Sequence, residues 1–480
     1  MTLDSGICYR ALRARDARFD GRFFVAVSST RIYCRPICTV RPPKRENCRF
    51  FTSAAAAESS GYRPCLRCRP ELAPGNASVD ATTRLAQAAA TMLEDRTADE
   101  EGLEAVAARL GVTDRHLRRA FGAEFGVSPV EFAQTQRLLL AKRLLTDTAL
   151  PVTEVAFASG FGSVRRFNAL FRQRYRLKPR SLRGRGAATG SDALDFELSF
   201  RPPFDWPAVS TFLGARAIAG VERLEDGCYR RTVRIASDGK ERRGWVAVGL
   251  SPKKPTLRVA VSASLVKALP PVLSRVKALM DLACNPAEVA QALGALARPH
   301  PGLRVPGAFD GFEIAVRAIL GQQVTVAGAR TLAGRFADAF GDPIETPFAG
   351  LATLFPTAQR VAALPAGRIA RLGMPRARAR TIVALARAVA DGRLALVPNA
   401  DVDATLGGLR ALRGIGEWTA QYIAMRALSW PDAFPHTDLG VMKALGGKGA
   451  KRVLKAGEAW RPWRAYAVMH LWQSLAKEQR

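Results

Sequence analysis

Residues 412–420 read Leu-Arg-Gly-Ile-Gly-Glu-Trp-Thr-Ala, and this stretch decides how the C-terminal part of the chain folds. Gly414 and Gly416 permit a tight turn between two helices, because glycine adopts backbone conformations that other residues avoid. The backbone N–H groups that open the next helix can then bind a phosphate group, often with a monovalent cation. The stretch predicts a helix-hairpin-helix that contacts DNA at these two glycines. The alternative is a tight turn between packed helices.

A carboxylate follows this hairpin within a short distance along the chain. Residues 434–438 read Phe-Pro-His-Thr-Asp and end on Asp438. An acidic side chain downstream of a phosphate-binding turn strengthens the prediction of an enzyme that acts on DNA. The alternative for Asp438 is a cap at the start of a surface helix. His436 is expected to pack or to hydrogen-bond locally.

The segment from about Leu194 to Leu475 resembles the AlkA family of 3-methyladenine-DNA glycosylases. In that family the aspartate after the hairpin is catalytic, which implies the same role for Asp438. The matching stretches are Pro-Phe-Asp-Trp at 203–206, Cys-Asn-Pro at 284–286, Arg-Ala-Ile-Leu-Gly-Gln at 317–322, Leu-Gly-Met-Pro at 372–375 and Trp-Arg-Ala-Tyr at 463–466.

The resemblance implies hydrolysis of the bond between an alkylated base and its sugar. A base alkylated on a ring nitrogen is already cationic, so a carboxylate that stabilises the positively charged sugar is sufficient. The nucleotide must first be flipped out of the base stack. Aromatic side chains favour a cationic base, although each could instead pack in the core. The pocket candidates are Trp418, Tyr422, Trp463 and Tyr466.

Differences from related enzymes narrow the range of activities that the resemblance implies. Those that also cut the strand have a Schiff-base lysine where this chain has Trp418, and those with an iron–sulfur cluster need four cysteines after the hairpin, where this chain has none. A monofunctional glycosylase is therefore implied. Two residues also differ from the AlkA family. Gln323, which is expected to contact DNA, stands where the best-known family member has a bulky apolar wedge. Leu439 stands where an aromatic residue follows the aspartate.

Two helix-turn-helix units are expected between residues 83 and 182, where helix-forming residues dominate. Thr113 and Ser163 are the predicted N-caps of the two second helices, and residues 130–145 form a connecting helix. The tandem arrangement resembles the AraC-type DNA-binding module, whose alternative is ordinary helix packing. The outward side chains expected to contact DNA are Arg115, Arg118, Arg119, Arg165 and Asn168.

Six of the eight cysteines lie in the first 68 residues. Such clustering, without a recognisable signal peptide, indicates a metal site and not disulfides. Cys34 with Cys38, and Cys65 with Cys68, are short-spaced pairs that can each aim two sulfurs at one Zn²⁺ ion. The alternative is a zinc knuckle that only stabilises a small domain.

Residues 8–72 resemble the N-terminal domain of the Ada DNA-repair protein, through the stretches at 21–38, 41–50 and 61–70. In that family the cysteines bind zinc, and the first of the Cys-x-x-x-Cys pair accepts a methyl group from a DNA methylphosphotriester. This role falls to Cys34. Losing one negative charge on methylation is expected to tighten DNA binding. Basic residues expected to hold the phosphate are Arg35, Arg41, Lys44, Arg45 and Arg49.

The charge of the chain fits a nucleic-acid partner. Its 480 residues include 72 Lys+Arg and 42 Asp+Glu, a net charge of +30. Such an excess is costly unless a polyanion neutralises it.

The hydrophobic fraction of 48% excludes a mainly disordered chain. No apolar run reaches the ~18 residues of a membrane span, so a cytoplasmic protein without membrane contact is expected.

These features predict a multidomain α+β protein. A small zinc-bound α/β domain (1–79) is expected before an all-α tandem helix-turn-helix domain (80–182) and a Gly-rich linker (183–192). Three antiparallel strands at 229–235, 244–250 and 257–261 place an α/β layer at 193–309, followed by an all-α helix-hairpin-helix glycosylase domain at 310–480.

The predicted function is an alkylation-response protein with two repair activities. It excises bases such as 3-methyladenine and 7-methylguanine, transfers a methyl group to Cys34, and activates transcription. Its expected partners are double-stranded DNA and RNA polymerase. The alternative is a transcription regulator whose C-terminal part is a catalytically weak DNA-binding module.

Overall fold

The N-terminal domain is built on a four-stranded sheet in the computed structural model, which describes residues 4–74, 81–94, 97–182, 192–237, 239–398, 400–447 and 449–478. Strand β2 (Ile32–Cys34) pairs in parallel with β4 (Arg63–Pro64), with Tyr33 opposite Pro64. The two cysteine pairs therefore start from the same end of the sheet. The sheet is completed by β1 (Phe24–Val27) and β3 (Cys48–Phe51), and it is accompanied by α1 (Ser5–Ala14) and α2 (Ala54–Ser59).

Six helices follow, and they contain both expected helix-turn-helix units. The first unit pairs α4 (Thr97–Arg109) with α5 (Asp114–Phe125), and the second pairs α7 (Val152–Ala158) with α8 (Val164–Tyr175). The side chains of Thr113 and Ser163 accept hydrogen bonds from the first turns of α5 and α8, which confirms both N-caps. Helix α6 (Pro129–Asp147) is the predicted connecting helix, and α3 (Ala81–Glu94) precedes the first unit. The expected linker lies outside the described residues, except for Asp192.

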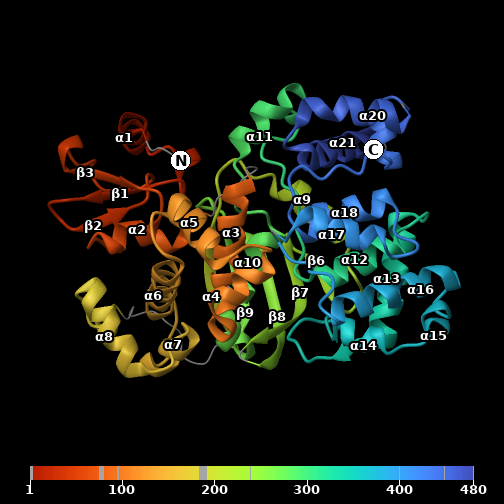
Figure 1. The fold of residues 1–480 in the computed structure, drawn as a ribbon, viewed down its shortest axis with the longest axis horizontal. Coiled ribbons are helices and arrows are strands. Elements are labelled where there is room, and N and C mark those ends of the chain that lie inside the picture. The colour runs from red at the N-terminus through yellow and green to blue at the C-terminus, as the bar shows by residue number, and fades with distance from the viewer. Residues whose placement is uncertain are drawn as a thin grey trace.

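A five-stranded antiparallel sheet stands in the middle of the molecule (Figure 1). The predicted strands correspond to β7 (Cys228–Ser237), β8 (Lys240–Leu250) and β9 (Thr256–Ser262), which confirms all three. Two edge strands, β5 (Ala193–Ser199) and β6 (Glu222–Glu225), were not predicted. Strand β5 does carry an alternating pattern, Leu194, Phe196 and Leu198, whereas β6 is short and mostly charged.

Helices make up most of the rest of the chain, as predicted for residues 310–480. Two short strands, β10 (Asp342–Pro343) and β11 (Thr353–Leu354), are the exceptions, so this region is not entirely α-helical. No helix in the described ranges is long and apolar enough to cross a membrane. The helices are α9 (Trp206–Ala215), α10 (Leu269–Leu279), α11 (Pro286–Leu293), α12 (Gly311–Leu320), α13 (Val326–Phe340), α14 (Ala358–Ala362), α15 (Ala366–Ala370), α16 (Arg376–Ala390), α17 (Val402–Arg410), α18 (Glu417–Ala427), α19 (Leu439–Ala444), α20 (Ala450–Gly457) and α21 (Arg464–Glu478).

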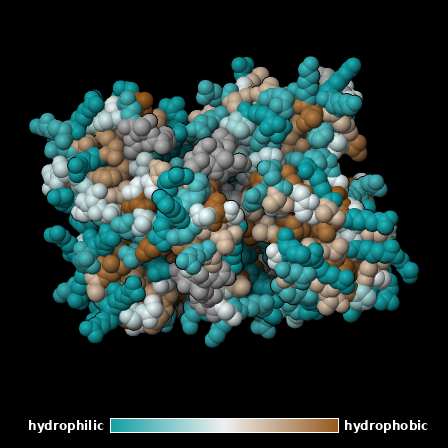
Figure 2. Space-filling model, in the orientation of Figure 1, coloured by the Kyte–Doolittle hydropathy of each residue, from teal (hydrophilic) through white to brown (hydrophobic). Residues whose placement is uncertain are grey.

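One apolar core runs from the second helix-turn-helix unit into the C-terminal part. It includes Leu144 of α6 and Phe167 of α8 together with Val259 of the central sheet and Ala424 of α18. Hydrophilic side chains cover most of the face shown in Figure 2, as expected for a chain with this net charge. The second helix-turn-helix unit is therefore packed on the C-terminal part and not merely tethered to it.

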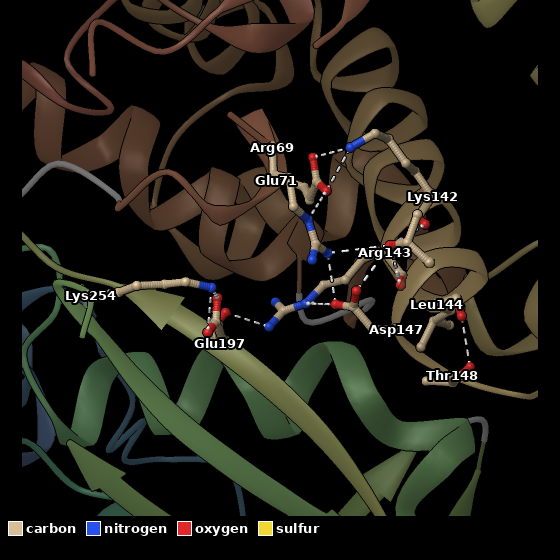
Figure 3. Close-up of polar contacts among 10 residues, drawn as sticks. Arg69, Glu71, Lys142, Arg143, Leu144, Asp147, Thr148, Glu197 and Lys254 are labelled. Atoms are coloured by element: carbon tan, nitrogen blue, oxygen red, sulfur yellow. Dashed lines mark hydrogen bonds and ion pairs between the residues drawn. The ribbon is translucent and has the colours of Figure 1, made fainter. Parts of the chain in front are cut away.

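Three parts of the chain meet at α6 (Figure 3). Lys142 of this helix forms an ion pair with Glu71 of the N-terminal domain at 2.6 Å, and their side chains are 1% and 2% exposed. Arg69 pairs with Asp147 at 2.7 Å. On the other side, Arg143 donates from Nη2 to the backbone oxygen of Glu197 in β5 at 2.6 Å. Helix α6 thus binds both neighbouring domains through buried charged groups.

A second buried contact joins the N-terminal domain to the connecting helix α6 and to α8 of the second helix-turn-helix unit. The Glu58 carboxylate accepts hydrogen bonds from Tyr33 at 2.8 Å, from Tyr175 of α8 at 3.2 Å and from Thr135 of α6 at 3.5 Å. Burial raises the pKa of this carboxyl to about 8, although the hydroxyl donors and Arg174 oppose the rise. Tyr33, the residue next to Cys34, is therefore linked to α8 through the Glu58 carboxylate.

We expect Glu71→Gln to lower the free energy of unfolding by roughly 3–5 kcal/mol, because it leaves the buried ammonium group of Lys142 without its counter-charge. Urea denaturation of the full chain measures this. The control is Glu225→Gln, whose ion pairs with Arg223 and Arg230 involve a side chain that is 40% exposed. Its loss should cost less than about 1 kcal/mol. Equal effects of the two substitutions would contradict the role given to the buried pair.

Candidate active site and metal centre

The four predicted zinc ligands converge in the N-terminal domain. The sulfur atoms of Cys34, Cys38, Cys65 and Cys68 all lie within 4.8 Å of one another. Three of these side chains are buried and Cys68 is partly exposed. The backbone N–H of Arg35 donates to Cys68 Sγ at 3.3 Å, and such donors orient metal-binding thiolates. Four cysteine sulfurs in one cluster are the donor set of a structural Zn²⁺ site, so these residues fit the metal.

Arg35 does not have the position expected of a phosphate-binding residue. The residue is only 4% exposed, its Nε donates to Asp20 at 2.8 Å, and its Nη1 donates to the backbone oxygen of Cys68 at 3.3 Å. The Asp20 carboxylate already neutralises this guanidinium, so the prediction that Arg35 contacts DNA is wrong. Arg35 instead holds the cysteine loops together. The other four predicted basic residues, Arg41, Lys44, Arg45 and Arg49, are exposed.

The predicted DNA-contacting residues of the two helix-turn-helix units lie at the surface. Their helices are anchored by fully buried rings, including Phe121 in α5 and Phe167 in α8. Asn168 is partly buried, and Arg118 pairs with Asp114 at 2.8 Å. Sequence reasoning missed Arg166, which is exposed in the first turn of α8 directly after Arg165. The exposed members of the predicted set are Arg115, Arg118, Arg119 and Arg165.

The predicted hairpin joins α17 to α18. Gly414 has φ +97°, and a Cβ atom there would lie 2.2 Å from Thr381 Oγ1, so only glycine fits this turn. Gly416 precedes α18, and no side chain caps that helix. Both glycines are exposed. The first N–H groups of α18 are thus available to an anion such as a DNA phosphate.

Asp438 lies beside this helix and is held by three N–H donors. Trp418 Nε1 donates to its Oδ2 at 2.7 Å, and Trp472 Nε1 donates to its Oδ1 at 2.9 Å. The backbone N–H of Val441 also donates to Oδ1 at 2.9 Å, which makes Asp438 the N-cap of α19. The helix-cap interpretation is therefore correct, and it is compatible with catalysis because the cap fixes where the carboxylate points.

Aromatic rings surround this carboxylate. Trp418 and Tyr422 stack one helical turn apart, with ring centroids 5.4 Å apart and planes inclined by 18°. Trp472 of α21 lies 6.4 Å from Tyr422 and stacks on Phe212 of α9 at 6.2 Å. Sequence reasoning missed Trp472 and Phe212, because neither belongs to a recognisable motif and both lie far from Asp438 along the chain.

Trp463 and Tyr466 lie elsewhere, so their predicted place in the pocket needs correction. Both are buried and pack edge-to-face, and the Tyr466 hydroxyl donates to Asp281 at 2.8 Å. Tyr466 and Trp472 are six residues apart on α21, about 240° around the helix axis, so they point in different directions. For these two aromatics the core-packing alternative is correct.

Arginine side chains contact the aromatic cluster. Arg426 donates from Nη1 to the Tyr422 hydroxyl at 2.9 Å, and Arg216 lies over the Phe212 ring, with Cζ 3.8 Å from its centroid. Burial would raise the pKa of Tyr422, but the positive charges of Arg426, Arg216 and Arg317 lower it overall.

Comparison with known proteins agrees with this architecture along the whole chain. Four family models match: metal binding domain of Ada at residues 7–71, helix-turn-helix domain at 106–185, AlkA N-terminal domain at 195–310, and HhH-GPD superfamily base excision DNA repair protein at 316–449. The fold and the site thus define a base-excision type of DNA-repair protein joined to an Ada-type regulator.

Individual proteins similar to this chain identify its family more closely than the domain models do. A Mycobacterium tuberculosis protein described as a probable bifunctional transcriptional activator/DNA repair enzyme AlkA is 40% identical, over 98% of this chain and 96% of its own. The chain belongs to this family. DNA-3-methyladenine glycosylase 2 of Escherichia coli is 37% identical over 58% of this chain and 96% of its own. The bifunctional transcriptional activator/DNA repair enzyme Ada of E. coli is 38% identical over 29% of this chain and 38% of its own.

We expect the purified chain to contain about one Zn per molecule, because four thiolates form a complete tetrahedral ligand set. The double substitution Cys65→Ala/Cys68→Ala should remove the metal, as measured by elemental analysis. Cys48→Ala is the control, since Cys48 is in the same domain but outside the cluster. A full equivalent of metal in the double variant would contradict the four-cysteine assignment.

Proposed function

We propose that this protein removes alkylated bases from DNA by hydrolysis and also accepts methyl groups from the DNA backbone. The observation that carries the first activity is the Asp438 carboxylate, held by Trp418 and Trp472 among stacked aromatic rings, next to an uncapped helix N-terminus. A carboxylate alone could cap a helix. A carboxylate that two indoles orient beside an aromatic surface is built for a cationic substrate.

Base excision follows from this arrangement. The hairpin binds a phosphate of the duplex, with a monovalent cation as its proposed companion, and the alkylated nucleotide leaves the stack. Trp418 and Tyr422 attract the cationic base. As the bond between base and sugar breaks, Asp438 stabilises the positive charge on the sugar, and water adds there and releases a proton. The proposed substrates are bases of the 3-methyladenine and 7-methylguanine type.

Methyl transfer is proposed for Cys34 of the N-terminal domain. Its sulfur forms a bond to the methyl carbon as the carbon–oxygen bond of the methylphosphotriester breaks, and the phosphodiester leaves as an anion. Zinc bound by the four cysteines would keep the sulfur deprotonated. Exposed basic residues such as Arg45 hold the DNA backbone near the cluster. The transfer occurs once per molecule, since nothing restores the thiolate.

Transcription activation is the proposed task of the tandem helix-turn-helix units, with RNA polymerase as partner. We assign residues 1–79 to methyl transfer, 80–182 to promoter binding, 193–309 to the α/β layer and 310–480 to excision, with 183–192 as the linker. The second candidate, a regulator with a catalytically weak C-terminal part, is disfavoured by the aromatic cluster at Asp438, which promoter binding does not require.

We expect Asp438→Asn to lower the single-turnover rate of 3-methyladenine release by roughly 100-fold or more, because the amide cannot offset positive charge on the sugar. Asp401→Asn is a matched control: Asp401 caps α17 as Asp438 caps α19, but away from the aromatic cluster. Asparagine caps helices well, so both variants should fold. Wild-type release by Asp438→Asn would refute the mechanism.

Incubation with DNA that carries methylphosphotriesters should add one methyl group to Cys34, which peptide mass mapping detects. Asp438→Asn should accept the methyl group normally, since the two sites use different residues. Cys34→Ala should accept none and should still excise bases. A methyl group on Cys38, or repeated turnover, would overturn the assignment of Cys34 as a single-use acceptor.

A further inference from the structure

A buried arginine of the C-terminal part contacts the N-terminal domain. Arg201 lies two residues after β5 and is only 1% exposed. Its Nη1 donates to the backbone oxygens of Ala283 at 2.9 Å and Cys284 at 3.4 Å. Its Nη2 lies against Gly21 of the N-terminal domain, 3.4 Å from the position that a Cβ atom would take there. Arg201 is thus anchored in one part of the chain and packed on the other.

Asp20, the neighbour of Gly21, is the negative charge that faces this contact. Burial lowers the pKa of Arg201 to about 10, and the charge of Asp20 opposes the fall. Asp20 is itself 2% exposed, and it accepts hydrogen bonds from Nε and Nη2 of Arg35. One carboxylate therefore attracts a buried guanidinium from each part of the chain. Buried charges are costly unless such partners keep them in place.

Arg35 connects Asp20 to the zinc ligands. It follows Cys34 in the sequence, its backbone N–H donates to Cys68 Sγ at 3.3 Å, and its Nη1 donates to the Cys68 backbone oxygen at 3.3 Å. The loops of Cys34 and Cys68 are therefore joined at two points. Asp20 holds the guanidinium that makes the second of these hydrogen bonds. A displacement of Asp20 would move the two cysteine loops relative to each other.

We propose that Arg201 is a positioning residue for methyl transfer at Cys34. The inference rests on the proposed methyl transfer. Arg201 keeps Asp20 in place, and Asp20 fixes Arg35 and the direction in which the Cys34 sulfur points. Direction matters because the sulfur must approach the methyl carbon in line with the carbon–oxygen bond that breaks, and small misplacements of reacting atoms slow a reaction strongly. The C-terminal part thus contributes a residue to the site of the other repair activity.

The test measures one round of methyl transfer by the full chain from duplex DNA that carries methylphosphotriesters. The rate constant at saturating DNA reports the positioning of Cys34, whereas the amount of methyl taken up reports the fraction of folded protein. The variants are Arg201→Gln, Arg201→Lys and Asp20→Asn. Glu288→Gln is the matched control, because it removes a different ion pair between the same two parts of the chain, that of Glu288 with Arg22 at 2.7 Å.

Arg201→Gln should lower the rate constant roughly tenfold, because glutamine lacks the charge that holds Asp20. The amount of methyl taken up and the half-saturating DNA concentration should stay unchanged, since Arg201 is buried. Asp20→Asn should slow transfer at least as much, because it acts on Arg35 directly. Arg201→Lys keeps the charge and should recover most of the wild-type rate, and Glu288→Gln should transfer as wild type does.

Cobalt bound in place of zinc gives a readout that needs no DNA. The thiolate-to-cobalt absorption bands depend on the geometry of the four sulfurs, which neighbouring groups orient. Arg201→Gln and Asp20→Asn should therefore shift these bands, and Glu288→Gln should not. Arg201→Gln should also release 3-methyladenine at the wild-type rate.

Other outcomes overturn the proposal in distinguishable ways. Less methyl taken up at an unchanged rate constant would make Arg201 a folding contact only. A wild-type rate for Asp20→Asn would exclude the connection, even if Arg201→Gln does not fold. Unchanged cobalt bands in both variants would exclude a change in sulfur geometry. Wild-type protein that takes up no methyl would refute the proposed transfer, and the cobalt bands alone would then show whether Arg201 positions the cysteines.

Discussion

The buried ion pair between Lys142 and Glu71 fixes the N-terminal domain on helix α6, on which the C-terminal part also packs. Two unlike charges that are almost completely removed from water must stay together, because separating them would leave an uncompensated charge in the interior. Lys142 and its neighbour Arg143 extend from the same helix in different directions, one to the N-terminal domain and one to β5. Helix α6 cannot shift relative to either partner without breaking one of these contacts.

The Asp438 site shows how one residue serves structure and chemistry together. An N-cap must accept the hydrogen bond of a helix amide, and this requirement fixes its side-chain rotamer. The indoles of Trp418 and Trp472 then act on a carboxylate that is already oriented. Catalysis benefits because the negative charge is in place before the sugar becomes positive, so no reorganisation is needed during the reaction.

Local patterns were sufficient to predict both helix-turn-helix units, three strands of the central sheet and half of the pocket residues. N-caps, hairpin glycines and short-spaced cysteines express constraints between residues close in sequence, so Thr113, Ser163 and the cysteine cluster are where they were expected. Trp472 and Phe212 reach the site through the packing of distant helices, which no local pattern encodes. Arg35 is the reverse case, a residue that was predicted to contact DNA but does not have the required position. Only the fold shows that Asp20 neutralises its charge.

The second helix-turn-helix unit and the C-terminal part share a continuous apolar core, so this chain is not a fusion of domains that are connected only by a linker. Domains that fold independently and are joined only by flexible linkers can be separated, exchanged or duplicated during evolution without harm to either domain. Here a cut after α8 would open the apolar core to which Leu144, Phe167 and Val259 all belong, and the exposed surface would drive aggregation. The two halves of this chain are thus joined by a shared apolar core as well as by the chain itself.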